Sequence, residues 1–305
     1  MLVLNEQVCI FYGQWAAIHI PAMILSGPQG TIERIRGMHP EDQLTDTVWA
    51  EGGLVVNADT QKVVYWGGER YLVPHVRRYA AQVWQRLWPG WNIAWAVYGQ
   101  PDIARACGID PVRVIVTEYD YQPFLFGSDP LIVPQHIVAL AEPTSYLEKY
   151  VLSVRFPNGS IADYLLGVAA DQEVGHGLTS LDCVLTLGPA LAEILLSLVP
   201  VALQREDGYD GGVALDFQQQ TMLVWTRWDL DERKITALGR RWPGWTIQTH
   251  EDGPVQHLAL LSREHSSFLV PKSECIQEMI PALIDYLPYA EREEKQRLLT
   301  EILLP

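Results

Sequence analysis

The chain has 305 residues, of which 48% are hydrophobic and 19% are charged, and its formal net charge at pH 7 is -15. This composition is typical of a folded globular protein and excludes a long disordered chain. The negative charge disfavours binding to nucleic-acid phosphates and to anionic membrane surfaces, so we expect neither partner. A basic protein is the natural electrostatic complement, although an acidic balance also serves solubility alone.

The cysteines at positions 9, 107, 183 and 275 form no CxxC pair and have no histidine at ligand spacing. We therefore expect buried, reduced thiols, no structural metal and no cofactor. The apolar N-terminal stretch lacks a basic region before it, and no stretch reaches about 18 uninterrupted apolar residues. These features predict neither a signal peptide nor a membrane span, and they favour a reducing cytoplasm as the location.

The first part of the chain alternates strand-like and helical patterns. Residues 7–25 carry short β-branched and aromatic runs that predict one or two strands before the turn at 27–30. Residues 53–57 and 62–66 predict a β-hairpin, and 71–87 an amphipathic helix that ends at Pro89-Gly90. A strand over 92–98 and a short helix over 100–107 follow.

The middle of the chain predicts a strand over 112–118, a loop-rich stretch to residue 143, and a hairpin of 150–156 with 161–167 across Asn158-Gly159. Residues 181–187 predict a further strand, and 189–199 an apolar helix. The remaining predicted elements are strands at 213–217, 222–225 and 246–250, a helix at 229–241 capped by Asp229, and terminal helices at 274–287 and 289–304.

One motif occurs twice: Trp88-Pro89-Gly90-Trp91 recurs as Trp242-Pro243-Gly244-Trp245, 154 residues later. The stretches at 52–57 and 63–66 recur at 211–216 and 222–225, at an offset of 159. We therefore predict an α+β fold of two related units of mixed or antiparallel sheet with packed helices, a pseudo-duplication. The predicted units are residues 1–118, with the N-terminal strands, and residues 119–305, with the C-terminal helices.

The paired tryptophans admit two interpretations. Indole rings stack on bases, sugars or cations, which would make them a ligand platform. Alternatively, Pro-Gly enforces the turn from helix to strand while each tryptophan fills the adjacent core. We favour the structural interpretation, because a turn needed for folding must be present in both copies, whereas a site need persist only in one.

Motifs for catalysis are absent from the sequence. It contains no G-x-S-x-G, H-E-x-x-H, G-x-G-x-x-G or G-x-x-x-x-G-K-[ST] pattern. His250 and His257 are seven residues apart across a predicted turn, which is no recognised metal pattern. His176, in Gly175-His176-Gly177, and His19 are the candidate titrating groups if a cleft between the two units holds a small molecule.

Acidic residues lie in several predicted loops rather than on amphipathic helices. They are either ordinary loop polarity or a negatively charged recognition face for a partner. The candidate partner-binding residues are Glu41, Asp42, Glu118, Asp120, Glu206, Asp207, Asp210, Glu251 and Asp252.

Taken together, the Gly-Gly hairpin, helix and Trp-Pro-Gly-Trp unit, its second copy and the central hairpin at 150–159 resemble a family of bacterial cytoplasmic proteins of similar length. The resemblance spans about residues 50–250 and brings no catalytic residue with it. Small acidic proteins of this type are often immunity partners of secreted polymorphic toxins.

The resemblance therefore implies a non-catalytic immunity protein that occludes a basic toxin domain. Two alternatives stay open: a small-molecule enzyme or ligand-binding protein that uses a cleft between the units, and an adaptor or chaperone for a secretion system.

Overall fold

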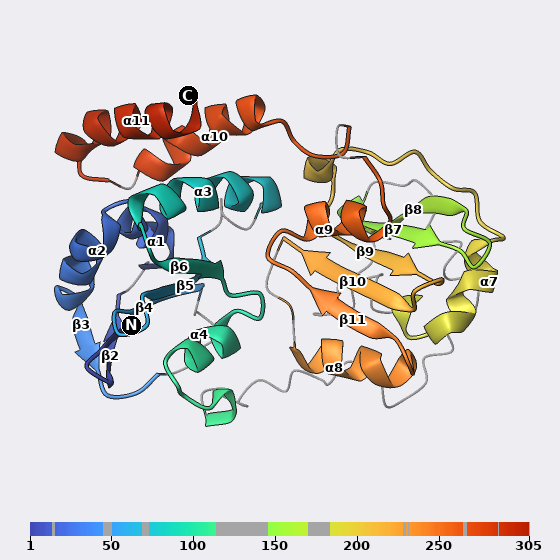
Figure 1. The fold of residues 1–305 in the computed structure, drawn as a ribbon, viewed down its shortest axis with the longest axis horizontal. Coiled ribbons are helices and arrows are strands. Elements are labelled where there is room, and N and C mark those ends of the chain that lie inside the picture. Colours follow the sequence, from blue (N-terminus) through green and yellow to red (C-terminus); the bar gives the residue numbers. More distant parts are fainter. Residues whose placement is uncertain are drawn as a thin grey trace. The chain divides into compact units, whose positions relative to one another are not determined.

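The computed structural model describes residues 1–13, 16–44, 51–68, 73–113, 146–169, 184–227, 230, 232–264, 267–285 and 287–304. The chain forms two compact units, residues 1–118 with 271–305 (unit 1) and residues 119–270 (unit 2). Each unit combines a mixed sheet with helices, so the α+β class is as predicted (Figure 1). The C-terminal helices belong to unit 1, and their assignment to residues 119–305 was wrong.

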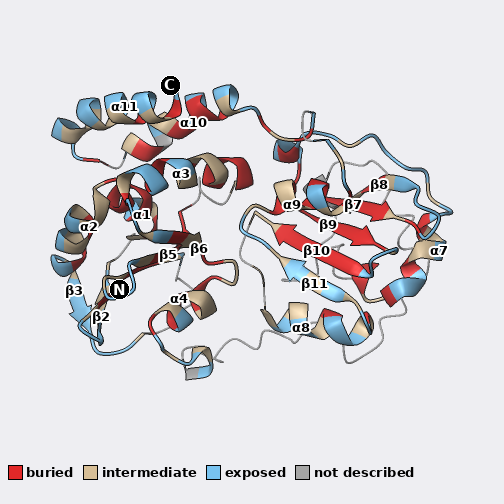
Figure 2. Cartoon of the chain, in the orientation of Figure 1, coloured by how far each residue is buried: buried red, intermediate tan, exposed pale blue. Residues whose placement is uncertain are grey.

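Unit 1 contains a six-stranded sheet in the order β3-β2-β1-β4-β5-β6. Its strands are β1 (Leu2–Leu4), β2 (Gln7–Tyr12), β3 (His39–Glu41), β4 (Gly52–Asn57), β5 (Lys62–Gly67) and β6 (Asn92–Trp95). The β1–β4 and β5–β6 pairs are parallel, and the other pairs are antiparallel. Strands β4 and β5 are largely buried, whereas β3 is exposed at the edge of the sheet (Figure 2).

The helices of unit 1 come from both ends of the chain. They are α1 (Ala16–Ile24), α2 (Gly27–Arg36), α3 (Pro74–Leu87), α4 (Gln100–Ala106), α10 (Lys272–Ile284) and α11 (Tyr289–Leu303). Helices α1 and α4 pack on β4 and β5, and α10 and α11 pack on α3. The C-terminal helices bury Cys275, Met279 and Leu299 completely. Apolar burial against α3 therefore explains why this distant segment completes unit 1.

Unit 2 contains a five-stranded sheet in the order β11-β10-β9-β7-β8. Its strands are β7 (Tyr146–Arg155), β8 (Ile161–Ala169), β9 (Gly211–Asp216), β10 (Thr221–Thr226) and β11 (Thr246–Thr249), and its α-helices are α7 (Leu191–Leu195), α8 (Glu232–Arg241) and α9 (Gly253–Leu260). A large core around Leu152, Leu215 and Trp242 includes Leu191 and Leu195 of α7 and Leu238 of α8. A second core around Trp225 lies under α9.

The two sheets have the same order and register over five strands. Residues Lys62 to Tyr65 of β5 face Asn92 to Trp95 of β6, and Thr221 to Val224 of β10 face Thr246 to Thr249 of β11. These pairs lie at the sequence offsets of 159 and 154. The backbone bond from Ala58 N to Val3 O recurs as Phe217 N to Arg155 O. The likeness of the units is thus structural, while their origin by duplication stays a prediction.

The two Trp-Pro-Gly-Trp turns are built alike. Trp88 and Trp242 are fully buried, and their indole Nε1–H groups donate to Ile24 O and Leu185 O, each at 2.8 Å. Gly90 and Gly244 have φ of +83° and +82°, a left-handed conformation that glycine adopts without strain. Each buried tryptophan also meets the second tryptophan of its motif edge-on. The burial predicted for the structural interpretation is confirmed.

Several local predictions differ from the structure. Residues 16–24 form helix α1 and not a strand, because this short apolar run is buried against β4 and β5 as a helix. Residues 184–187 form no strand, and residues 111–113 form a 3-10 turn. Cys9 is exposed on β2, although we expected it to be buried. Asp229, the predicted cap, and Cys183 lie outside the described residues.

Candidate functional site

The first predicted acidic pair lies at the edge of the sheet of unit 1. Glu41 is the last residue of β3 and Asp42 follows it, and both side chains are exposed. Glu41 pairs in register with Ile10 of β2. The position is accessible to a partner, although residues 39–41 form a strand and not the predicted loop. Glu118, Asp120 and His176 lie outside the described residues.

The pair Glu206 and Asp210 has a different role. Glu206 is 2% exposed, and its carboxylate accepts a 2.7 Å hydrogen bond from Val270 N. The Asp210 carboxylate accepts from Lys149 N and from Arg227 Nη1, both at 2.9 Å. The prediction that Glu206 contacts a partner was therefore wrong, because its carboxylate is buried and hydrogen-bonded inside the unit. Asp210 is engaged in the same way. Of the three predicted acidic residues in this loop only Asp207 is exposed, and Arg205 pairs with it at 2.5 Å.

Glu251 and Asp252 lie immediately before α9. Glu251 is exposed, and Asp252 is half-buried with its backbone N–H donating to His250 Nδ1 at 3.0 Å. Asp252 O accepts from Gln256 N in the first turn of the helix. A carboxylate here stabilises the helix N-terminus, so Asp252 has a structural role besides its accessibility.

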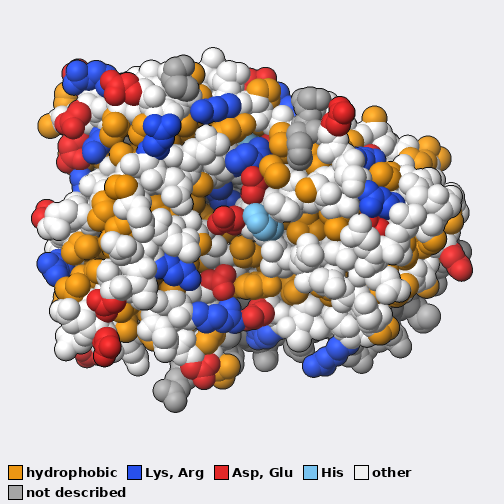
Figure 3. All heavy atoms as spheres, viewed as in Figure 1, with side chains coloured by type: hydrophobic (Ala, Val, Ile, Leu, Met, Phe, Trp, Pro, Cys, Tyr) orange, Lys and Arg blue, Asp and Glu red, His pale blue; other side chains and the backbone are white. Residues whose placement is uncertain are grey.

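The negative charge is unevenly distributed along the sequence. The described residues carry 26 acidic and 21 basic side chains, whereas the remaining residues carry 11 acidic side chains and one basic. Residues 114–145 and 170–183 hold seven of those 11 and no Lys or Arg. On the visible face of unit 1, carboxylates and cations are interspersed over α11 and α2 (Figure 3). Most of the net charge of -15 therefore resides outside the described residues.

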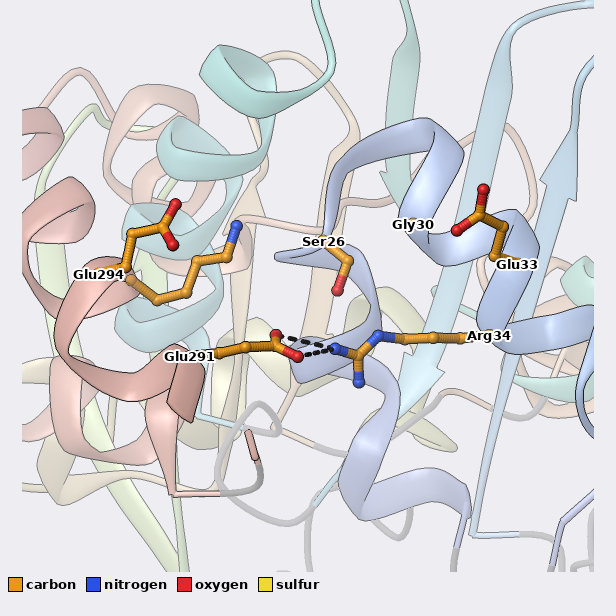
Figure 4. A pocket seen from close by; sticks show the side chains of 7 residues that line it. Ser26, Gly30, Glu33, Arg34, Glu291 and Glu294 are labelled. Carbon is orange, nitrogen blue, oxygen red and sulfur yellow. Dashed lines mark hydrogen bonds and ion pairs between the residues drawn. The ribbon is translucent and has the colours of Figure 1, made fainter. Parts of the chain in front are cut away.

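One hollow in unit 1 lies between α2 and α11. It has a volume of about 510 Å³ and is lined by Ser26, Gly30, Glu33, Arg34, Glu291, Glu294 and Lys295. Arg34 Nη2 donates to both carboxylate oxygens of Glu291, at 3.1 and 2.9 Å, and so crosses the hollow (Figure 4). Gln29 Nε2 donates to Glu33 Oε1 at 2.7 Å. The lining is thus polar and nearly balanced in charge.

A smaller hollow of about 240 Å³ shares Arg34 with the first. Its other lining residues are Gly13, Ala16, His19, Ala22, Met23 and Met38. It lies where β2 ends, α1 begins and β3 is about to start. Apart from Arg34 and His19, the lining is apolar, which suits an apolar side chain better than a charged one.

Unit 2 contains a buried polar cluster on the face of the sheet that α9 covers. Arg263 Nη1 donates to both oxygens of Asp163 at 2.8 Å, and Ser153 Oγ donates to Asp163 Oδ1 at 2.5 Å. Arg155 Nη1 donates to Asp216 Oδ2 at 2.6 Å. Each carboxylate has its partner inside the unit, as buried charges require. The serine and the aspartates are therefore engaged in hydrogen bonds and ion pairs within the unit.

His257 is fully buried beneath the same sheet. Its Nδ1 accepts from Trp225 Nε1 at 3.0 Å, and its ring stacks on Phe268. Burial, together with the nearby Arg263 charge, lowers the pKa of His257 from 6.5 to about 3. The imidazole is therefore neutral at pH 7 and out of contact with solvent, which does not fit a general base for a diffusing substrate.

Sequence reasoning missed the apolar hollow. Met23 and Met38 carry no motif, and only His19 drew attention as a titrating group. The sequence does contain a glycine, Gly13, upstream of two methionines. These residues can be recognised as one site only in the fold, where α1, α2 and the ends of β2 and β3 bring them together.

Among the described residues, no group of three or more His, Cys, Asp or Glu is placed to hold a metal ion. None of the described helices is both long and apolar enough to cross a membrane. Comparison of the chain with protein-family models, curated proteins and solved structures gave no match.

Proposed function

We propose that this protein is a non-catalytic binding protein of the immunity type, which neutralises a cognate basic toxin domain by occlusion in the cytoplasm of the producing cell. The observation that carries the proposal is the net charge of -15. Acidic surfaces steer basic partners into encounter and raise the association rate. Among the described residues, the exposed members of the predicted acidic set are Glu41, Asp42, Asp207 and Glu251.

The contacts of the side chains that could act in catalysis favour a binding function over an enzymatic one. Ser153 donates to a carboxylate that Arg263 already holds, and His257 is buried with its Nδ1 occupied. A nucleophile needs an adjacent base and access for the substrate. These groups instead stabilise the interior of unit 2, which is what a rigid recognition scaffold needs.

Co-expression is the direct test. We expect that cells producing the basic domain encoded beside this gene survive only when this protein is co-expressed, and that the purified pair associates more slowly as salt rises. Exposed charges are screened within about 8 Å at physiological ionic strength. Replacing Glu41 and Asp42 together by lysine should lower the association rate more than it raises the dissociation rate.

The matched control reverses two exposed carboxylates elsewhere, Glu264 and Glu301, which changes the net charge by the same amount. It should lower the association rate less. Unprotected cells, or turnover of a small-molecule substrate by the purified protein alone, would contradict the proposal.

A further inference from the structure

The hollow at the ends of β2 and β3 has the dimensions of a single side chain. Its volume of about 240 Å³ lies below the roughly 300–1,000 Å³ of pockets that enclose drug-sized ligands. Gly13 allows Met38 to approach the backbone closely, because a Cβ at this position would lie 2.6 Å from Met38 Cε. Ala16 and Ala22, the small residues that α1 contributes to the lining, leave space in the hollow.

The lining suits an apolar anchor. Met23 and Met38 supply unbranched, polarisable side chains that adjust to the shape of an inserted group. Tyr12, next to Gly13 in the chain, is 61% exposed at the end of β2. Exposed tyrosines beside a pocket are typical of protein interfaces, where an aromatic or aliphatic anchor fills a desolvated site.

The charges around the hollow select the partner. Glu33 on α2, Glu41 at the end of β3 and Asp42 directly after it are exposed, against one exposed cation on α2, Arg36. Arg34 is held by Glu291. Glu41 follows Met38 by three residues, and an extended chain rises about 3.3 Å per residue, so Glu41 lies about 10 Å along β3 from the methionine.

We propose that this apolar hollow is the anchor point of the basic partner, and that it takes one large apolar side chain flanked two or three residues away by Lys or Arg. The inference rests on the proposed function and adds its contact point to it. Glu41 and Asp42 meet the basic flank, while Met23 and Met38 close on the anchor.

Methionine methyl NMR tests the site, with defined peptides as probes. The chain has five methionines; Met23 and Met38 line the hollow, whereas Met222 and Met279 are fully buried elsewhere. A peptide with one tryptophan and lysines two and three residues away on each side should shift the methyl signals of Met23 and Met38 and leave those of Met222 and Met279 in place. The same peptide with alanine for tryptophan should bind at least about tenfold more weakly.

The variant Ala16→Phe fills the hollow, and Ala259→Phe makes the same change at an exposed helical position of unit 2. Circular dichroism and thermal melting establish that each variant is folded, and Ala16→Val is the milder substitute. We expect Ala16→Phe to abolish the Met23 and Met38 shifts and Ala259→Phe to preserve them. Equal shifts in both variants, or shifts spread over all methionines, would overturn the proposed site.

The two proposals fail in different ways. Peptide binding at Met23 and Met38 without protection of cells would refute the immunity function and leave the site standing. Protection that persists in Ala16→Phe would refute the site and leave the function standing.

Discussion

Units 1 and 2 share a backbone frame and differ in what fills one face of it. Under α9, unit 2 buries His257 and Asp163, and the half-buried Arg263 pairs with Asp163. The equivalent positions in unit 1, by register and sequence offset, are Ile103, Ile10 and Ile109; Ile109 N donates to Ala104 O as Arg263 N donates to Leu258 O. The comparison indicates that strand register and the Trp-Pro-Gly-Trp turn define the frame, whereas the residues of the polar cluster in unit 2 correspond to isoleucines in unit 1.

The largest expected effect concerns what the two units share. Replacing Trp88 or Trp242 by alanine should lower the free energy of unfolding of its unit by about 3–5 kcal/mol, because a fully buried aromatic side chain is lost and a carbonyl is left without its donor. Urea titration followed by far-UV circular dichroism measures both variants.

Trp91 and Trp245 are the matched controls, since both are only partly buried. Their alanine variants should cost less than those of Trp88 and Trp242. A large loss in one unit and none in the other would break the comparison.

The second prediction concerns what distinguishes the units. Arg263→Ile alone should lower the unfolding free energy by about 3 kcal/mol, because it leaves the Asp163 carboxylate buried beside Ser153 without its cation. The double change Asp163→Ile with Arg263→Ile copies the residues of unit 1 and should recover most of that loss. Chemical denaturation of the single and double variants measures this coupling. A double variant as unstable as the single one would show that unit 2 depends on the charge pair itself.

The third prediction is a pH dependence confined to unit 2. The folded pKa of His257 is about 3 and its unfolded value is near 6.5, so the unfolded state binds the proton more readily. The stabilisation is therefore present above pH 6.5 and is lost progressively as the pH falls towards 3. Between pH 7.5 and 5.5, His257 should account for about 1.4 kcal/mol of lost unfolding free energy.

His257→Gln supplies the control, because its amide oxygen can accept from Trp225 Nε1. Denaturation at the two pH values should show a smaller loss in this variant than in the natural chain. Identical losses would mean that other groups dominate the acid sensitivity.

The repeated motifs predicted the frame because they act locally. Pro-Gly ends a helix in either unit, and the two offsets, 159 before the helix and 154 after it, showed which strands correspond. Helix α9 was missed, since Gly253-Pro254 was interpreted as a turn, although proline is favourable in the first turn of a helix. The interpretation of Glu206 failed for a different reason: its partner, Val270 N, is 64 residues away, and no local pattern shows that a loop carboxylate will be buried.

The candidate site was the least predictable part for the same reason. The exposure of Glu41 and Asp42 follows from the polar sequence around them, but the apolar hollow depends on Gly13, Met23 and Met38, which come from three separate segments of the chain. Each of these residues alone is compatible with ordinary core packing.

The smallest expected change in stability concerns a turn that the two units share. Gln61 and Gln220 occupy equivalent turns with φ of +50° and +51°, a left-handed conformation that costs a non-glycine residue roughly 1–2 kcal/mol. Glycine removes this strain but loses more backbone entropy on folding, about 0.5–1 kcal/mol. The net gain from Gln61→Gly or Gln220→Gly should therefore be about 0.5 kcal/mol and alike in the two units.

In both turns a side-chain oxygen, of Asn57 or of Asp216, already accepts from two backbone N–H groups, so the turn stays formed without the glutamine. Thermal melts of the two variants should move upward together; a gain in one unit with a loss in the other would show that the likeness of the turns does not extend to their energetics.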